Sequence, residues 1–169
     1  MRFVLSSKEA FGSELLNIPW ADAFLSSKIL VVGVDDKSNV VTVCGIRSLF
    51  NILTLYVCEQ FRGRGIGSQI LEKTIGITRE CRLGFILLGV PYTNVRAFRL
   101  YSKFGFKEVV HLAKPGLRIM MLPTDFVGEV AYLFLCGITS LLPNVFWTYT
   151  AQWIHDRTVS DVKSVAGCG

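Results

Sequence analysis

The apolar residues of the chain recur in two different rhythms, which together predict a mixed α/β domain. Short runs rich in β-branched side chains predict strands, because such side chains suit a pleated, half-buried surface. We expect seven strands, at residues 2–6, 28–34, 40–46, 52–57, 85–90, 107–112 and 117–121. The run FILLGV at 85–90 is apolar throughout, which favours a strand buried on both faces.

Helical spacing appears between these runs. Apolar residues near one face predict a helix over 66–82, and the i, i+3, i+4, i+7 pattern predicts another over 95–104. Ser6 and Glu9 form a capping-box pattern for a helix that runs to about residue 16, and 21–24 adds a helical turn. The order of elements indicates an α/β fold with a mixed sheet. Its first half is antiparallel, and a strand-helix-strand unit occupies the middle.

Composition and charge narrow the class of partner. The chain has 169 residues, of which 51% are hydrophobic and 18% charged, so one domain plus an extension can bury a core. A net charge of +5 favours anionic ligands such as phosphates, nucleotides or anionic lipids, although it also fits a solvated basic surface. The chain has no long basic run, so we expect no nucleic-acid partner.

The cysteines give no sign of a metal or of a disulfide framework. Their number is five, none forms a CxxC pair, and neither histidine lies near one in the sequence. We therefore expect no metal site, and reduced thiols in a cytoplasmic protein. The apolar run at the N-terminus is too short for a signal peptide.

A glycine-rich turn between a predicted strand and a predicted helix carries the first candidate chemistry. Its glycines, Gly63, Gly65 and Gly67, stand at alternate positions, flanked by Arg62 and Arg64. The unpaired N–H groups and positive dipole end of a helix N-terminus can hold a phosphate. The spacing fits neither a Walker A loop nor GxGxxG. A turn that needs glycine only for packing is the alternative.

The helix predicted at 95–104 carries the second candidate segment. Asn94 suits its N-cap, and Gly105 suits a left-handed C-cap followed by Phe106. Tyr101 lies on the apolar stripe, but its hydroxyl needs a polar partner. The alternative is a core tyrosine whose hydroxyl reaches the surface.

These two segments resemble the two sequence motifs of the GNAT N-acetyltransferase superfamily. Arg62-x-x-Gly65-x-Gly67 is similar to its pyrophosphate-binding signature, and N-x-x-A-x-x-L-Y-x-K-x-G-F, from Asn94 to Phe106, is similar to its second motif. Both stand in the right order with one strand between them. The resemblance implies the GNAT acyl-CoA N-acyltransferase fold over residues 2–121, in which the fourth and fifth strands splay apart and the cofactor enters between them.

The resemblance also implies a set of site residues around acetyl-CoA. The pantetheine arm would run along the backbone of Leu55, Tyr56 and Val57, as an added strand does. The pyrophosphate would lie on the amides of 62–67, the segment Arg62, Gly63, Arg64, Gly65, Ile66 and Gly67. Asn94 and Ala97 would lie near the pantetheine. An N–H donor near Val90 would polarise the thioester carbonyl, and Tyr101 would act as general acid on the departing thiolate.

The implied reaction moves an acetyl group from acetyl-CoA to a primary amine of a small molecule or a protein. A general base is not evident, because 48–57 and 84–93 contain no Asp, Glu or His. Glu59 is the first candidate, His111 and Tyr92 are others, and a water chain or backbone carbonyls are a further alternative. A module that binds or senses acyl-CoA without catalysis also fits these residues.

The sequence after the expected domain is of a different kind. We assign 1–123 to the GNAT domain and 124–169 to a hydrophobic C-terminal extension, in which 130–154 has no charged residue. That stretch exceeds the roughly 20 apolar residues of a membrane span, but Pro143 and Asn144 divide it. It predicts a span that leaves the domain in the cytoplasm, two shorter elements packed on the domain, or a homodimer contact. With a span, the function would be that of a membrane-associated acyltransferase.

Overall fold

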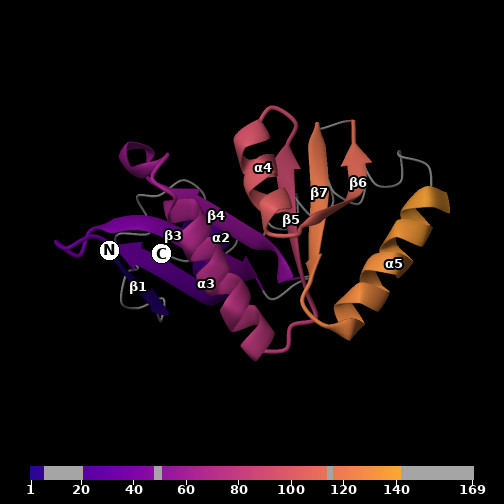
Figure 1. Cartoon of the computed structure of the whole chain (residues 1–169), viewed down its shortest axis with the longest axis horizontal. Helices are drawn as coiled ribbons and strands as arrows, with labels where there is room; N and C mark the ends of the chain where they lie inside the picture. The colour runs from indigo at the N-terminus through magenta and orange to yellow at the C-terminus, as the bar shows by residue number, and fades with distance from the viewer. Residues whose placement is uncertain (6–20, 48–50, 114–115, 142–169) are drawn as a thin grey trace, which may run out of the picture.

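A computed structural model describes residues 1–5, 21–47, 51–113 and 116–141 as two sheets side by side with helices packed on them (Figure 1). The helix predicted at 6–16 lies outside these described residues. The strands are β1 (Arg2–Leu5), β2 (Ser27–Val34), β3 (Val40–Arg47), β4 (Leu53–Val57), β5 (Phe85–Pro91), β6 (Lys107–Leu112) and β7 (Leu117–Pro123). The helices are α2 (Ala21–Leu25), η3 (Glu59–Phe61), α3 (Ile66–Glu80), α4 (Val95–Lys103) and α5 (Phe126–Leu141).

The two sheets confirm the mixed α/β fold and the predicted splay of the fourth and fifth strands. The first has the antiparallel order β1-β2-β3-β4, and the second has the antiparallel order β5-β7-β6. An isolated parallel bridge between Ile52 and Leu87 joins them where β4 and β5 begin. Beyond that bridge β4 and β5 belong to separate sheets, which leaves one edge of β4 open to a ligand.

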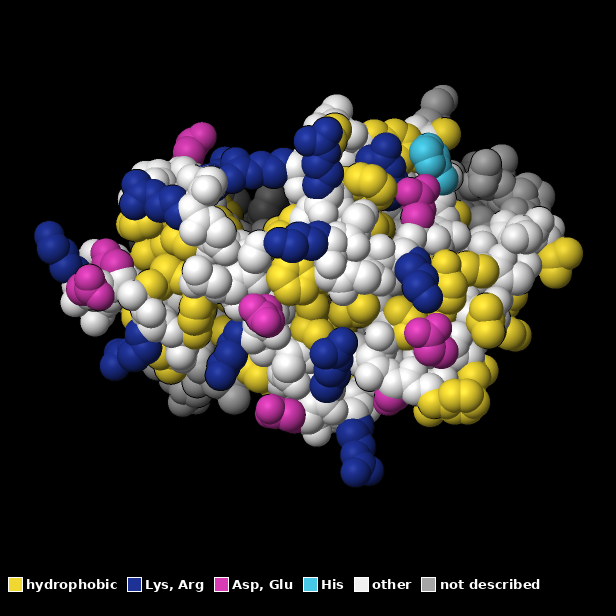
Figure 2. All heavy atoms as spheres, in the orientation of Figure 1, with side chains coloured by type: hydrophobic (Ala, Val, Ile, Leu, Met, Phe, Trp, Pro, Cys, Tyr) yellow, Lys and Arg dark blue, Asp and Glu magenta, His cyan; other side chains and the backbone are white. Residues whose placement is uncertain are grey.

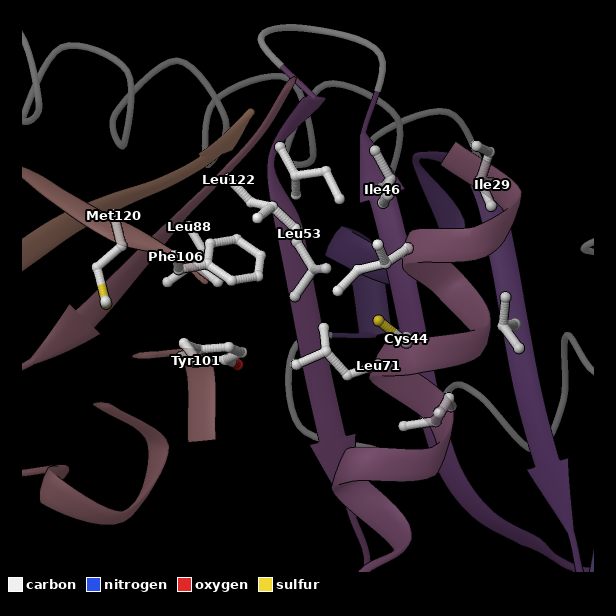
Figure 3. Close-up of a cluster of buried hydrophobic side chains, with 14 of the residues drawn as sticks. Ile29, Cys44, Ile46, Leu53, Leu71, Leu88, Tyr101, Phe106, Met120 and Leu122 are labelled. Atoms are coloured by element: carbon white, nitrogen blue, oxygen red, sulfur yellow. The ribbon is translucent and has the colours of Figure 1, made fainter. Parts of the chain in front are cut away.

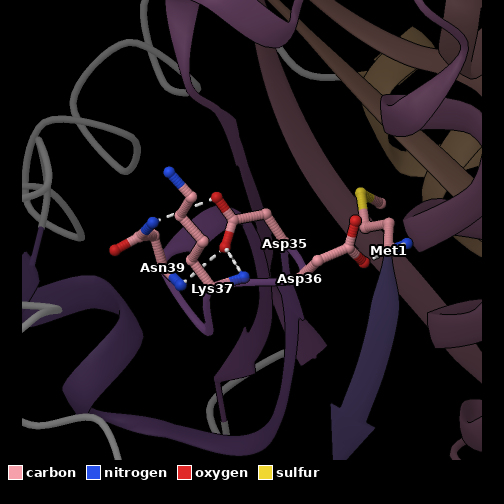
Figure 4. A network of polar contacts seen from close by, with 5 residues as sticks. All are labelled: Met1, Asp35, Asp36, Lys37 and Asn39. Atoms are coloured by element: carbon pink, nitrogen blue, oxygen red, sulfur yellow. Dashed lines mark hydrogen bonds and ion pairs between the residues drawn. The ribbon is translucent and has the colours of Figure 1, made fainter.

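The turn between β2 and β3 shows how local chemistry fixes the hairpin that the sequence predicted. Asp35 Oδ1 accepts hydrogen bonds from the backbone N–H groups of Lys37 and Asn39, both at 2.9 Å (Figure 4). Its Oδ2 accepts a third from Asn39 Nδ2 at 3.0 Å. These bonds, first those from Asn39, lower the pKa of Asp35. The carboxylate therefore stays ionised and keeps the turn closed.

The main hydrophobic core bridges the two sheets. Buried side chains of the first sheet and α3, such as Cys44 and Leu71, pack toward Leu88 and Met120 of the second sheet and Tyr101 of α4 (Figure 3). A second cluster lies on the opposite face of the first sheet, where Phe24 of α2 packs with buried residues of β2 and β3. The apolar face predicted for the helix at 66–82 is confirmed, since it supplies Ile66, Ile70, Leu71 and Ile75 to the buried set.

The prediction that β5 is buried on both faces is wrong. Ile86, Leu88 and Val90 are buried, whereas Leu87 is half-buried and Gly89 is exposed. The inward residues face the core that α4 covers, and α5 contacts only part of the outer face. An apolar run thus marks the strand without fixing how many of its faces are covered.

Asn51 braces the closed end of the splay between β4 and β5. Its backbone is left-handed (φ 49°), and its Nδ2 donates to the carbonyl oxygens of Leu83 at 2.9 Å and Phe85 at 3.0 Å. The bonds tie the residue before β4 to the start of β5, next to the Ile52 bridge. The amide therefore sets where the two strands begin to diverge.

Replacing Asn51 with glycine is expected to lower the free energy of unfolding by about 1–3 kcal/mol. Glycine keeps the left-handed backbone at this position but loses both hydrogen bonds. Urea unfolding measures the change. Ser38→Gly is the control, because Ser38 is also left-handed but exposed, and it should change stability little. Equal effects of the two variants would contradict a bracing role for Asn51.

The first part of the expected extension packs on the second sheet. Asp125 Oδ1 accepts from the backbone N–H of Gly128 at 2.9 Å and so caps the start of α5. Gly128 lies against the carbonyl of Gly84, where a side chain would collide with backbone. Residues 142–154 of the predicted span lie outside the described residues. Within the part of the chain that the structure describes, no helix is long and apolar enough to cross a membrane.

Candidate functional site

A pocket of about 590 Å³ opens between the end of β4 and the N-terminal ends of α3 and α4. Figure 2 shows Lys and Arg side chains beside a hollow at the upper edge of the molecule. Most of the residues predicted to hold acetyl-CoA meet in this pocket. Its lining consists of Leu55, Tyr56, Val57, Phe61, Arg62, Gly63, Gly65, Ile66, Gly67, Ser68, Asn94, Arg96, Ala97, Leu100 and Tyr101.

The glycine-rich turn forms an open cradle at the start of α3. Gly63 and Gly65 have φ of 86° and 77°, in the left-handed region that favours glycine. Gly65 is the N-cap of α3, and a Cβ placed there would meet no protein atom within 4 Å. The first N–H groups of a helix have no carbonyl partner one turn back, so those of Ile66 and Gly67 are available to a ligand in this space. The turn therefore has the shape and the polarity of an anion site.

Two arginines of the lining add positive charge to the cradle. Arg62 is held in place because its Nε donates to the carbonyl of Val57 at 3.1 Å. Arg96 lies in the first turn of α4, and its guanidinium is 3.6 Å from where a Cβ on Gly63 would lie. Sequence reasoning missed Arg96. Arg96 stands two residues after the Asn94 cap, in the first turn of a helix whose start faces the cradle. That position is the signal that could have identified it.

The first turn of α4 is fixed by its cap. The Asn94 side chain accepts a hydrogen bond from the backbone N–H of Ala97 at 3.1 Å, as predicted for an N-cap. Both residues line the pocket. The cap therefore sets the direction in which α4 carries Arg96 and Tyr101 toward the pocket.

Tyr101 reaches the pocket from the core. Only 8% of the residue is exposed, and its ring packs edge-on against Phe106 with centroids 5.6 Å apart. Burial, and then the nearby Cys44 thiol, raise the pKa of Tyr101 well above its usual value. Its hydroxyl has no hydrogen-bond partner among the described residues. At neutral pH the phenol is thus a proton donor available to a ligand.

Two buried acids make the fold sensitive to alkali. Burial raises the pKa of Cys44 from its usual 9.0 to about 12, and that of Tyr101 also rises. Above pH 9 for Cys44 and above pH 10 for Tyr101, the unfolded chain ionises the group while the folded chain keeps it protonated. The free energy of unfolding should therefore fall with rising pH, by about 1.4 kcal/mol per pH unit for each fully titrating group.

Urea unfolding at pH 7.5, 9, 10 and 10.5 tests this dependence. Cys44→Ala should be less stable at every pH, because it leaves a small void in the core, but its loss of stability between pH 9 and 10 should be smaller. A variant as steep as the wild type would show that the Cys44 thiol does not contribute.

Three of the predicted site residues lie outside the pocket lining. The Glu59 side chain is 90% exposed and pairs with Arg62 at 3.7 Å. The Arg64 guanidinium lies over the ring of Phe61, at 5.6 Å. Val90 is buried in the core, and its backbone lies opposite that of Arg118 in the β5–β7 ladder. The local sequence could not predict where these three residues lie relative to the pocket, because their positions depend on how the turn and the two sheets pack.

The other base candidates also stay outside the lining. His111 and Tyr92 stack with ring centroids 4.3 Å apart, and His111 Nδ1 lies 3.1 Å from Glu108 Oε1. None of the described residues that line the pocket is Asp, Glu or His. Among the described residues, no group of three His, Cys, Asp or Glu side chains is placed to hold a metal ion.

The chemistry of the pocket fits coenzyme A. A phosphate fits the cradle, where a Cβ at Gly65 would project, and Arg62 and Arg96 complement its charge. The free edge of β4 offers backbone groups to an extended amide-containing chain. Tyr101 lies in the same pocket as these groups.

Comparison with known proteins agrees with this site. Residues 26–108 match a family model described as an acetyltransferase (GNAT) domain. An N-acetyltransferase from Staphylococcus aureus Mu50 superimposes with a TM-score of 0.61 at 18% identity, over 73% of this chain and 98% of that one. A Salmonella typhimurium protein whose structure holds its cofactor acetyl-CoA gives 0.60 at 18% identity, over 74% and 94%. The ribosomal-protein-S18-alanine N-acetyltransferase of Escherichia coli gives 0.59 at 17% identity, over 76% and 96%.

At these identities the structural likeness establishes the fold alone. No curated protein matches the chain. The family rests on the matched domain model, which covers the glycine-rich cradle and the α4 segment with Tyr101. Residues 26–108 thus form a GNAT acetyltransferase domain, and the chain belongs to the GNAT acetyltransferase family.

Proposed function

We propose that the protein is an acetyl-CoA-dependent N-acetyltransferase that acts on a primary amine of a small molecule or a protein. One observation carries the proposal: a single pocket brings together the phosphate cradle of α3, the open edge of β4 and the Tyr101 hydroxyl. These are the parts needed to bind the nucleotide end of acetyl-CoA, direct its pantetheine arm and protonate its sulfur.

The residues of the cradle would hold the pyrophosphate. Backbone N–H groups from 62–67 donate to it, and the guanidinium groups of Arg62 and Arg96 neutralise its charge. The backbone of Leu55–Val57 pairs with the pantetheine amides. The proposed contacts do not include Val90 or the side chains of Glu59 and Arg64, because none of them lines the pocket.

Tyr101 would supply the proton of the reaction. When bound, acetyl-CoA supplies an acetyl thioester, whose carbonyl carbon a neutral amine can attack. As the carbon–sulfur bond breaks, the Tyr101 hydroxyl donates its proton to the sulfur. The amine loses its own proton to water, because the described lining offers no acidic or imidazole side chain, and water returns a proton to the Tyr101 phenolate. Positioning of the two reactants provides the rest of the rate.

The proposal is tested with a panel of amines in the presence of acetyl-CoA. The panel includes small primary amines, peptides with free N-termini and peptides with a free lysine side chain. We expect amine-dependent release of the coenzyme A thiol, with a matching acetylated product in the mass spectrum. Tight binding of acetyl-CoA without acetylation of any amine would overturn the enzymatic proposal and leave an acyl-CoA-binding module.

A further inference from the structure

The side of α5 that faces away from the sheet carries an unusual amount of exposed apolar surface. Its large side chains are between 51% and 83% exposed, and Figure 2 shows apolar side chains gathered at the α5 end of the molecule. We call this set the outer stripe. It consists of Phe126, Val127, Val130, Leu133, Phe134 and Leu141.

The outer stripe lies opposite the contacts that hold α5 to its own chain. Lys107 of β6 approaches the ring of Tyr132 at 5.0 Å, and Thr139 Oγ1 donates to the carbonyl of Val109 at 3.3 Å. Met121 of β7 is fully buried in the sheet that α5 contacts. The fold of one chain therefore uses the inner side of α5 and leaves the outer stripe without a described partner.

The spacing of the stripe is that of a helix–helix seam. Val127, Val130, Phe134, Gly137 and Leu141 alternate steps of three and four residues, the pattern by which two helices interlock. Gly137 lies in the middle of the seam, and a Cβ there would meet no protein atom within 4 Å. Glycine weakens a helix interior, and packing within one chain does not require it here. Close approach of a second helix would require a glycine at this position.

The size and charge of the stripe favour a second copy of the chain as the partner. Its exposed apolar area, on the order of 700 Å², exceeds the roughly 300–600 Å² of the largest patch on typical monomers and approaches the roughly 800 Å² per partner of stable interfaces. An amphipathic helix that binds anionic lipid carries Lys and Arg on its polar face. The helix α5 has neither, and its Glu129 pairs with Lys107 at 3.8 Å.

We propose that the outer stripe of α5 packs against the same stripe of a second copy and forms a two-fold symmetric homodimer. A two-fold axis makes the surface self-complementary, so one apolar seam satisfies both chains. An antiparallel pair also keeps the two acidic first turns of α5 apart and aligns the helix dipoles favourably. The interface is distinct from the pocket, because no residue of the stripe lines the pocket.

Sedimentation equilibrium of the full chain from 1 to 100 μM tests the dimer. We expect a dimer for the wild type and for Phe134→Leu, and at least tenfold weaker association for Phe134→Glu. Because Phe134 is 68% exposed, the circular dichroism of both variants should match that of the wild type. A wild type that stays monomeric to 100 μM, or a Phe134→Glu variant that associates as tightly as wild type, would overturn the proposal.

Gly137→Leu distinguishes a packed helix pair from nonspecific apolar association. It also provides a second test of the dimer if Phe134→Glu fails to fold. The added side chain makes the stripe more apolar but blocks close approach of a second helix, so the dimer should weaken. Stronger association would overturn the proposal. Monomeric wild type that sediments with phosphatidylcholine–phosphatidylserine vesicles would also overturn it and point to lipid. Monomer without vesicle binding would instead point to cover by residues 142–169.

Discussion

Replacing Gly65 with glutamate is expected to weaken acetyl-CoA binding by at least about 100-fold, since like charges brought together cost several kcal/mol. The reason is the position of Gly65 at the open end of the cradle, where its missing side chain leaves space for a phosphate. A glutamate there fills the space and places a carboxylate against the ligand's negative charge. Isothermal titration calorimetry with acetyl-CoA measures the loss.

Gly65→Gln is the matched control for charge. Both side chains suffer the same left-handed backbone, at φ 77°, and occupy almost the same volume. Their melting temperatures should therefore agree, while glutamine should weaken acetyl-CoA binding less than glutamate does. Equal weakening by both variants would assign the effect to bulk alone. If the glutamate variant bound acetyl-CoA with wild-type affinity, the cradle would not be the phosphate site.

Replacing Tyr101 with phenylalanine is expected to lower kcat by about 10²- to 10⁴-fold, the usual contribution of general acid catalysis. The change removes only the hydroxyl and keeps the ring packed against Phe106, so the dissociation constant of acetyl-CoA should hardly move. The raised pKa of Tyr101 keeps the wild-type phenol protonated at neutral pH, as a general acid requires. Steady-state kinetics with the best amine of the panel, together with calorimetry, measures both quantities.

Tyr92→Phe provides the control for loss of one buried tyrosine hydroxyl. The Tyr92 hydroxyl is buried without a hydrogen-bond partner among the described residues, and Tyr92 does not line the pocket. We expect its kcat to match the wild type. If Tyr101→Phe turned over as fast as Tyr92→Phe, the Tyr101 hydroxyl would have no part in the chemistry.

Much of this site could be predicted from the sequence, because its main parts are local. A glycine-rich strand-to-helix turn forms its cradle from consecutive residues, and Asn94 caps α4 through its own side chain. Seven strands, including the β2–β3 hairpin, follow from runs of β-branched residues and turn residues. Such features depend on nearest neighbours along the chain, where periodicity and capping chemistry carry information.

The parts that sequence could not give depend on contacts between distant segments. Arg96 joins the site because the start of α4 packs beside the glycine turn, whereas the Glu59 side chain is exposed and pairs with Arg62. The outer face of β5 is partly open because α5 covers only some of it. The seating of α5 depends on Gly128 meeting the Gly84 carbonyl, a pair far apart in the chain.

Amide hydrogen exchange of the wild-type chain with and without acetyl-CoA tests whether the ligand lies on the cradle and along the open edge of β4. Saturating acetyl-CoA should therefore slow exchange of the amides in 62–68 and Leu55–Val57, while the β2–β3 turn at Asp35–Asn39 should not change. Unchanged exchange in 62–68 at saturating acetyl-CoA, or protection confined to another part of the chain, would contradict the proposed site.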